Sequence, residues 1–68
     1  MAHVDSEAVT DIAYRSSDGQ LLVRFTSGEW YAYEQVPKAL YQRFLDSESK
    51  GRFFQHEVRD RFVYRRLS

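Results

Sequence analysis

The segment SGEWYAYEQVP, residues 27–37, holds three aromatic residues within four positions and then changes character. Trp30, Tyr31 and Tyr33 favour the pleated surface of a strand, so residues 29–35 predict a β-strand. Pro37 suits the first position of a helix, because the N–H that proline lacks would have no partner there. This segment therefore predicts the boundary at which a sheet ends and helices begin.

Two further strands are predicted before this segment. Residues 10–15 alternate between two kinds of side chain, and the run LLVRFTS, residues 21–27, also alternates and is rich in strand-forming residues. Asp18-Gly19 and Ser27-Gly28 mark tight turns between the strands, since glycine accepts a positive φ without a steric penalty. Three strands joined by short turns predict an antiparallel meander.

After Pro37 the apolar residues recur with the period of a helix. In residues 37–47 they form one helical stripe: Leu40, Tyr41, Phe44 and Leu45. In residues 50–62 they recur at every fourth position: Phe54, Val58 and Phe62. Ser47 or Ser49 can cap this second helix. The expected fold is α+β, a three-stranded antiparallel meander followed by two α-helices packed on one sheet face.

Strand alternation assigns the side chains of the sheet to two faces. The core is expected on the face that the helices cover: Ile12, Tyr14, Leu21, Val23, Phe25, Tyr31 and Tyr33, with Leu40, Phe44, Phe54 and Val58 from the helices. The opposite, open face is expected to show Ala13, Arg15, Leu22, Arg24, Thr26, Trp30 and Ala32. The two tyrosines of the opening segment are therefore expected inside, and Trp30 is expected to have a free face.

Sixty-eight residues predict one domain, which we place at residues 9–66 behind a flexible leader of residues 1–8. The tail from 62 to 68 fits a short strand, an extended arm or frayed chain. No signal peptide and no membrane-spanning run is visible, and the lack of cysteine fits a cytoplasmic protein. No membrane partner is therefore expected.

The net charge is zero, but the charges are unevenly distributed. Residues 1–34 carry two arginines against six acidic residues, and residues 35–68 carry eight basic against four acidic residues. The basic half can attract nucleic acid or an acidic partner, or the two halves can attract each other within the fold.

No catalytic or metal-binding constellation is visible. His3 and His56 lie far apart without the spacing of a metal site, and no serine lies in a GxSxG motif. We therefore predict no catalytic residues, no metal and no cofactor, and a protein that is not an enzyme.

Two groups of residues are candidates for binding. For nucleic acid they are Arg24 and Trp30 on the open sheet face, with Lys50, Arg52, Arg59 and Arg61 on the helices. Aromatic and arginine side chains can stack on bases while cations hold the backbone. Ser49, Lys50 and Arg52 can also hold a phosphate or carboxylate at the start of the second helix, or can simply form a capped helix start.

The order of these motifs resembles the KTSC domain, a small domain named after the C-terminus of some lysyl-tRNA synthetases and also found as a standalone bacterial protein. The resemblance covers roughly residues 6–66 and rests on five motifs in order: Tyr31-x-Tyr33, Val36-Pro37, Tyr41, the run SKGRFF at 49–54, and Arg59. Gln55 stands where asparagine is expected, and Phe62 where tyrosine is expected. The resemblance implies no established enzymatic activity and suggests a link to RNA by association alone.

These observations predict a small non-catalytic binding module for RNA, either tRNA or a single strand. The alternative is a module for protein–protein interaction or self-association that uses the open sheet face, where Leu22, Trp30 and Ala32 form an apolar patch.

Overall fold

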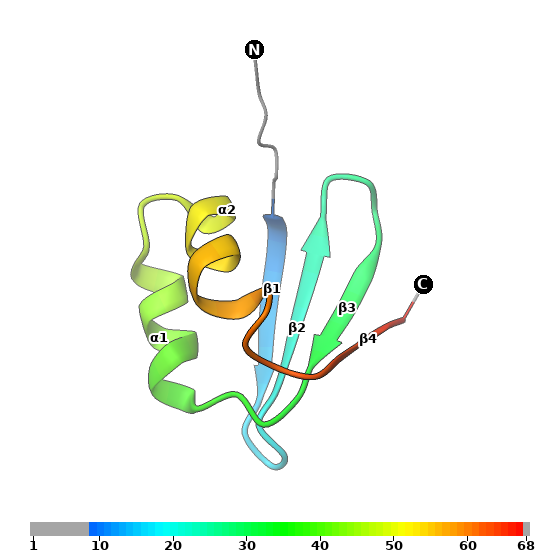
Figure 1. Cartoon of the computed structure of the whole chain (residues 1–68), viewed down its shortest axis with the longest axis vertical. Coiled ribbons are helices and arrows are strands. Elements are labelled where there is room, and N and C mark those ends of the chain that lie inside the picture. The colour runs from blue at the N-terminus through cyan, green and yellow to red at the C-terminus, as the bar shows by residue number, and fades with distance from the viewer. Residues whose placement is uncertain (1–8, 68) are drawn as a thin grey trace.

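The computed structural model describes residues 9–67, so the predicted leader at 1–8 lies outside the described residues. The elements in chain order are β1 (Val9–Arg15), β2 (Gln20–Phe25), β3 (Trp30–Tyr33), α1 (Lys38–Asp46), α2 (Lys50–Phe53), η1 (Phe54–Val58) and β4 (Tyr64–Arg66). The strands form one antiparallel sheet in the order β1-β2-β3-β4. The helices lie towards the β1 side, while β3 and β4 extend away from them (Figure 1). The predicted α+β class, with helices that follow an antiparallel sheet, is confirmed.

The predicted number of strands is wrong, because the tail returns to the sheet as β4. Tyr64 pairs with Tyr33, and Arg66 pairs with Tyr31. Backbone hydrogen bonds close both ends of this pairing: the Glu34 N–H donates to the Val63 carbonyl at 2.9 Å, and the Leu67 N–H donates to the Trp30 carbonyl at 2.8 Å. The free edge of β3 attracts these few residues, since each backbone group needs a hydrogen-bond partner. A short strand is one of three possibilities that the sequence leaves open for this tail, and three residues carry too little local pattern to decide between them.

The second predicted helix, residues 50–62, is also corrected. It consists of the four residues of α2 and one π-helical turn, η1, and it ends at Val58. The Arg59 N–H donates to the Phe54 carbonyl at 2.9 Å, the bond from residue i+5 to i that defines a π-helix. This wider turn allows Phe53 to stack on Phe44, with ring centroids 5.0 Å apart, while Phe54 points to the sheet.

The core lies between the sheet and the helices. Its buried members are Leu21, Val23, Tyr33, Val36, Phe44, Phe54 and Val58. The remaining predicted core residues are partly buried against this cluster: Ile12, Tyr14, Phe25, Tyr31 and Leu40. Val36 was not predicted; its carbonyl accepts a 2.6 Å hydrogen bond from the Tyr14 hydroxyl, and its N–H donates to the Gly19 carbonyl at 2.8 Å.

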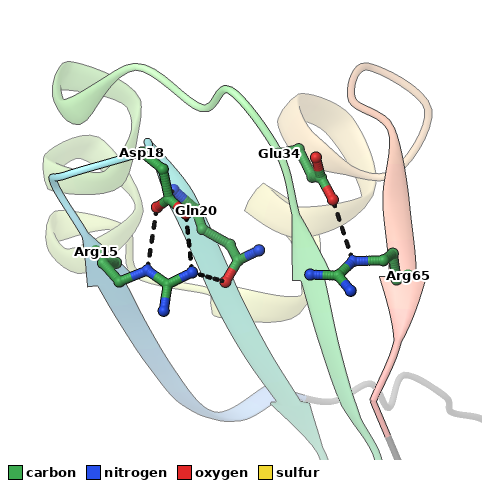
Figure 2. Close-up of polar contacts among 5 residues, drawn as sticks. All are labelled: Arg15, Asp18, Gln20, Glu34 and Arg65. Atoms are coloured by element: carbon green, nitrogen blue, oxygen red, sulfur yellow. Dashed lines mark hydrogen bonds and ion pairs between the residues drawn. The ribbon is translucent and has the colours of Figure 1, made fainter.

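The face of the sheet opposite the helices is more polar and less open than predicted. Ala32 is fully buried there, because its methyl group lies between the taller cross-strand neighbours Leu22 and Arg65. Trp30, expected to be free, is only partly exposed. The Arg65 Nε donates to the Glu34 carboxylate at 3.1 Å on this face (Figure 2).

The Arg15 side chain stabilises the first hairpin by hydrogen bonds on the same face. The Arg15 guanidinium donates to both Asp18 carboxylate oxygens, at 3.1 and 2.8 Å, and to the Gln20 side chain at 3.0 Å (Figure 2). The hydrogen bond from Arg15 lowers the pKa of the Asp18 carboxyl below its usual value. Gly19, with φ of 69°, supplies the left-handed backbone that the turn requires.

Candidate functional site

A cleft lies on the helix side of the sheet, between η1 and the strands β2, β3 and β4. Its volume is about 450 Å³. It is lined by Phe25, Glu29, Tyr31, Tyr33, Phe54, Arg59, Asp60 and Tyr64. We call it the tyrosine cleft. Strands β2, β3 and β4 supply its rings from one side, and η1 with the two residues after it forms the other side.

Three tyrosine rings form one surface of this cleft. Tyr33 and Tyr64 stack with centroids 5.3 Å apart, Tyr31 and Tyr33 stack at 6.5 Å, and Tyr31 and Tyr64 meet at 5.7 Å in a tilted arrangement. Phe25 and Phe54 present their edges to these rings at 5.5 Å. Tyr33 is 3% exposed, whereas Tyr64 is 53% exposed. The cluster therefore has a buried base and an accessible outer ring.

The charged groups of the cleft differ in their partners. The Glu29 carboxylate accepts a 2.7 Å hydrogen bond from the Arg66 guanidinium, and the Tyr31 hydroxyl donates to Glu29 at 3.5 Å. Within residues 9–67, neither Arg59 nor Asp60 makes a side-chain hydrogen bond or ion pair. The cleft thus offers one uncommitted guanidinium and one uncommitted carboxylate beside aromatic rings.

The Tyr33 hydroxyl stays protonated over the physiological range. Burial raises the pKa of Tyr33 to about 12, with smaller contributions in the same direction from Tyr64 and Tyr31 and an opposing one from Arg59. A neutral phenol at the base of the cleft can donate a hydrogen bond and adds no negative charge.

This raised pKa predicts a loss of stability in alkali. The unfolded chain releases the Tyr33 proton near pH 10, but the folded chain retains it until about pH 12, so the free energy of unfolding falls across this window. The loss is at most about 2–3 kcal/mol. In Tyr33→Phe the ring remains and the proton is absent, so its free energy of unfolding, measured in urea, should fall less between pH 10 and pH 12. Parallel pH profiles for the two proteins would contradict the assignment.

The predicted nucleic-acid residues are not gathered in one place. Arg24 and Trp30 are cross-strand neighbours on the face opposite the cleft, where the Arg24 guanidinium lies 3.7 Å from the Asp11 carboxylate. Arg59 lies in the tyrosine cleft. Arg61 is exposed just beyond η1, and its backbone N–H donates to the Val58 carbonyl at 3.1 Å. The structure therefore brings only Arg59 of this set to the aromatic rings.

In the predicted anion site at the start of α2, the side chains of Ser49 and Lys50 already form hydrogen bonds with backbone groups. The Ser49 hydroxyl accepts a 3.2 Å hydrogen bond from the Arg52 N–H, so it caps the helix. The Lys50 ammonium donates to the Ser47 carbonyl at 2.7 Å. Arg52 lines a shallow depression of about 400 Å³ that also contains Arg43. Anion binding by Ser49, Lys50 and Arg52 stays a prediction.

Of the residues that line the tyrosine cleft, the sequence predicts only Arg59 as a binding residue; it predicts four as core and misses three, Glu29, Asp60 and Tyr64. Tyr64 joins the cluster only through the register of β4, and Asp60 and Glu29 have no local motif. The Tyr31-x-Tyr33 spacing is a usable signal for the cleft, although strand alternation alone predicts both rings only as core. Both rings do face the helix side as expected, yet Tyr31 is only partly covered.

No group of three or more metal-ligating side chains occurs among residues 9–67. None of the helices in this range has the length and apolar character needed to cross a bilayer.

Comparison with known proteins identifies close relatives over most of the chain. A protein of Tsukamurella paurometabola is 37% identical over 62 residues, which cover 91% of this chain and 92% of that protein. A lysine–tRNA ligase of Trichormus variabilis is 30% identical over 60 residues, which cover 88% of this chain but only 11% of the ligase. The crystal structure of a KTSC domain protein from Yersinia pestis matches with a TM-score of 0.85 and 32% identity, covering 96% of this chain and 92% of that one.

These relatives share one domain, found here over nearly the whole chain and in the ligase over a small part of its length. The sequence profile of the KTSC domain matches residues 5–62, which include β1 to η1 and most of the residues that line the tyrosine cleft. This chain belongs to the KTSC domain family.

Proposed function

We propose that this KTSC domain is a non-catalytic binding module that holds single-stranded RNA in the tyrosine cleft. The observation that carries the proposal is the presence of three tyrosine rings beside an uncommitted arginine in one cleft. In this arrangement a base stacks on the exposed ring of Tyr64, and the Arg59 guanidinium pairs with a neighbouring phosphate. We further propose that the protein is located in the cytoplasm, where it would encounter single-stranded RNA.

The physical chemistry of the cleft supports this role. Stacking of a base on an aromatic side chain contributes about 1–3 kcal/mol and tolerates different bases. Arginine presents a planar fork that matches phosphate geometry. A volume of about 450 Å³ lies within the usual range for small-ligand sites. Because the net charge of the chain is zero, we expect affinity to depend on stacking more than on phosphate contacts.

A relative gives independent support. The Trichormus variabilis protein that contains a similar segment is, by its name, a lysine–tRNA ligase. A small RNA-binding module is a useful addition to a protein that acts on tRNA, although the remaining 89% of that ligase has no counterpart in this chain.

The proposal predicts a strong effect at Tyr64. Fluorescence anisotropy of a labelled short single-stranded RNA should detect binding at low salt, and Tyr64→Ala should weaken it by about tenfold or more. Tyr64 is 53% exposed and is not a member of the buried core, although its ring stacks on Tyr33, so circular dichroism of the variant checks the fold. Trp30→Ala is the matched control: it removes a ring from the opposite face, and the affinity should not change.

Two outcomes would overturn this assignment. One is the absence of binding by the unmodified protein at low salt, where phosphate contacts are strongest. The other is a loss of binding in Trp30→Ala with none in Tyr64→Ala, which would move the site to the open face.

The exposed apolar residues near β4 favour self-association as the second candidate function. Val63 is 76% exposed and Leu67 is 48% exposed. By strand alternation both lie on the same face as Arg65, and therefore on the face that carries Leu22 and Trp30. Sedimentation that depends on protein concentration would favour this function, and a strict monomer would exclude it.

A further inference from the structure

We infer that the tyrosine cleft selects guanine, and that the Asp60 carboxylate is the group that recognises it. This inference rests on the proposed function, because it names the base that the RNA-binding cleft prefers. The observations behind it are that Asp60 lines the cleft with the tyrosine rings and that, within residues 9–67, its carboxylate has no hydrogen-bond or ion-pair partner.

The other carboxylate of the cleft is already committed. Glu29 accepts a 2.7 Å hydrogen bond from Arg66 and lies 3.5 Å from the Tyr31 hydroxyl. Asp60 is exposed, so both of its oxygens can accept hydrogen bonds from a ligand. Of the two, Asp60 is therefore the carboxylate that is free to contact a stacked base.

The four bases differ in what they offer to a carboxylate. The Watson–Crick edge of guanine presents two adjacent donors, N1–H and the N2 amino group, which match the two oxygens of one carboxylate. Adenine and cytosine each present one amino donor next to a ring nitrogen that is an acceptor, and uracil presents one N–H between two carbonyl oxygens. Only guanine can therefore form two parallel hydrogen bonds, which are also charge-assisted.

The charge of Asp60 strengthens this discrimination. A carboxylate near RNA repels phosphate, and a base that cannot hydrogen-bond to it leaves that repulsion uncompensated. Arg59, the preceding residue, lines the same cleft and supplies the opposite charge for the phosphate. Tyr33 remains neutral at the base of the cleft and adds no further repulsion.

The test uses the unmodified protein and a series of short uridine-based RNAs that differ at one central base. The RNA with guanine should bind about tenfold more tightly than those with adenine or uracil, in line with the discrimination that a good bidentate contact provides. Inosine lacks the N2 amino group and retains N1–H, so its affinity should fall between those of guanine and adenine. This series does not depend on the folding of any variant.

A pair of variants assigns the preference to Asp60. Asp60→Asn should remove most of the guanine preference and raise the affinity for the all-uridine RNA, because the variant no longer repels phosphate. Asp46→Asn, which changes an exposed carboxylate outside the cleft, should keep the preference. Circular dichroism of both variants verifies the fold.

The outcomes separate this inference from the proposed function. Tight binding of every RNA with equal affinity would overturn guanine selection and leave RNA binding intact. A guanine preference that survives in Asp60→Asn would overturn the role of Asp60. Failure of all the RNAs to bind would overturn both proposals.

Discussion

Replacement of Phe44 by alanine is expected to leave the domain largely unfolded at 25 °C. Phe44 is fully buried and stacks on Phe53, with ring centroids 5.0 Å apart. Truncation of a buried phenylalanine costs about 3–5 kcal/mol, because the apolar contact is lost and a cavity remains. A single core in a chain below about 70–80 residues rarely supplies more than about 3–5 kcal/mol. The expected loss therefore equals the whole margin of stability.

Leu45→Ala is the matched control for this prediction. It removes a large apolar side chain from the next position of α1, but Leu45 is 48% exposed, so we expect a loss below about 1 kcal/mol. Urea unfolding followed by circular dichroism measures both variants. A stably folded Phe44→Ala protein would show that the core can close the cavity.

Removal of residues 63–68 is expected to destabilise the domain by about 2–3 kcal/mol and to open the tyrosine cleft. The truncation deletes β4, whose Tyr64 ring lies 5.3 Å from that of Tyr33 and 5.7 Å from that of Tyr31. It also removes the carbonyl of Val63, which accepts the Glu34 N–H at 2.9 Å. The remaining three strands and the core between them and the helices should stay folded.

Amide hydrogen exchange provides the residue-level measurement. In the truncated protein the Glu34 amide should lose protection, while amides of β2 should keep it, since β2 pairs with β1 and β3 on both sides. Arg65→Ala is the control, because it keeps the β4 backbone and Tyr64 and removes the cover of Ala32 and the exposed ion pair with Glu34, a pair worth less than about 1 kcal/mol. Unchanged stability after the truncation would show that β4 contributes nothing to the fold.

The sequence predicted the first three strands because they carry strong local patterns. Alternation placed Tyr31 and Tyr33 on the helix side and Trp30 on the other side, and the register confirms this phase. Turn residues such as Gly19, whose φ of 69° is unfavourable for other residues, separated the strands. These features depend on neighbours within a few positions, which a sequence displays directly.

The second helix shows where local pattern is insufficient. The four-residue spacing of Phe54, Val58 and Phe62 predicted a continuous helix to 62, but the helix ends at Val58 after a π-turn. The wide turn lets the neighbours Phe53 and Phe54 pack in different directions, one on Phe44 and the other on Phe25. These contacts form only when the helices dock on the sheet.

The sequence by itself therefore determined the α+β class, the family, the phase of each of the first three strands and most residues of the core. Only the tertiary structure decided that β4 completes the sheet, that Tyr64 joins Tyr31 and Tyr33, and that Arg59 and Asp60 line the same cleft. The physical reason is that strand alternation decides which way a ring faces, whereas its coverage depends on how far the helices extend over the sheet. Because Tyr31 is only partly covered and Tyr64 packs on both rings, a tyrosine pair predicted as core also lines the candidate site.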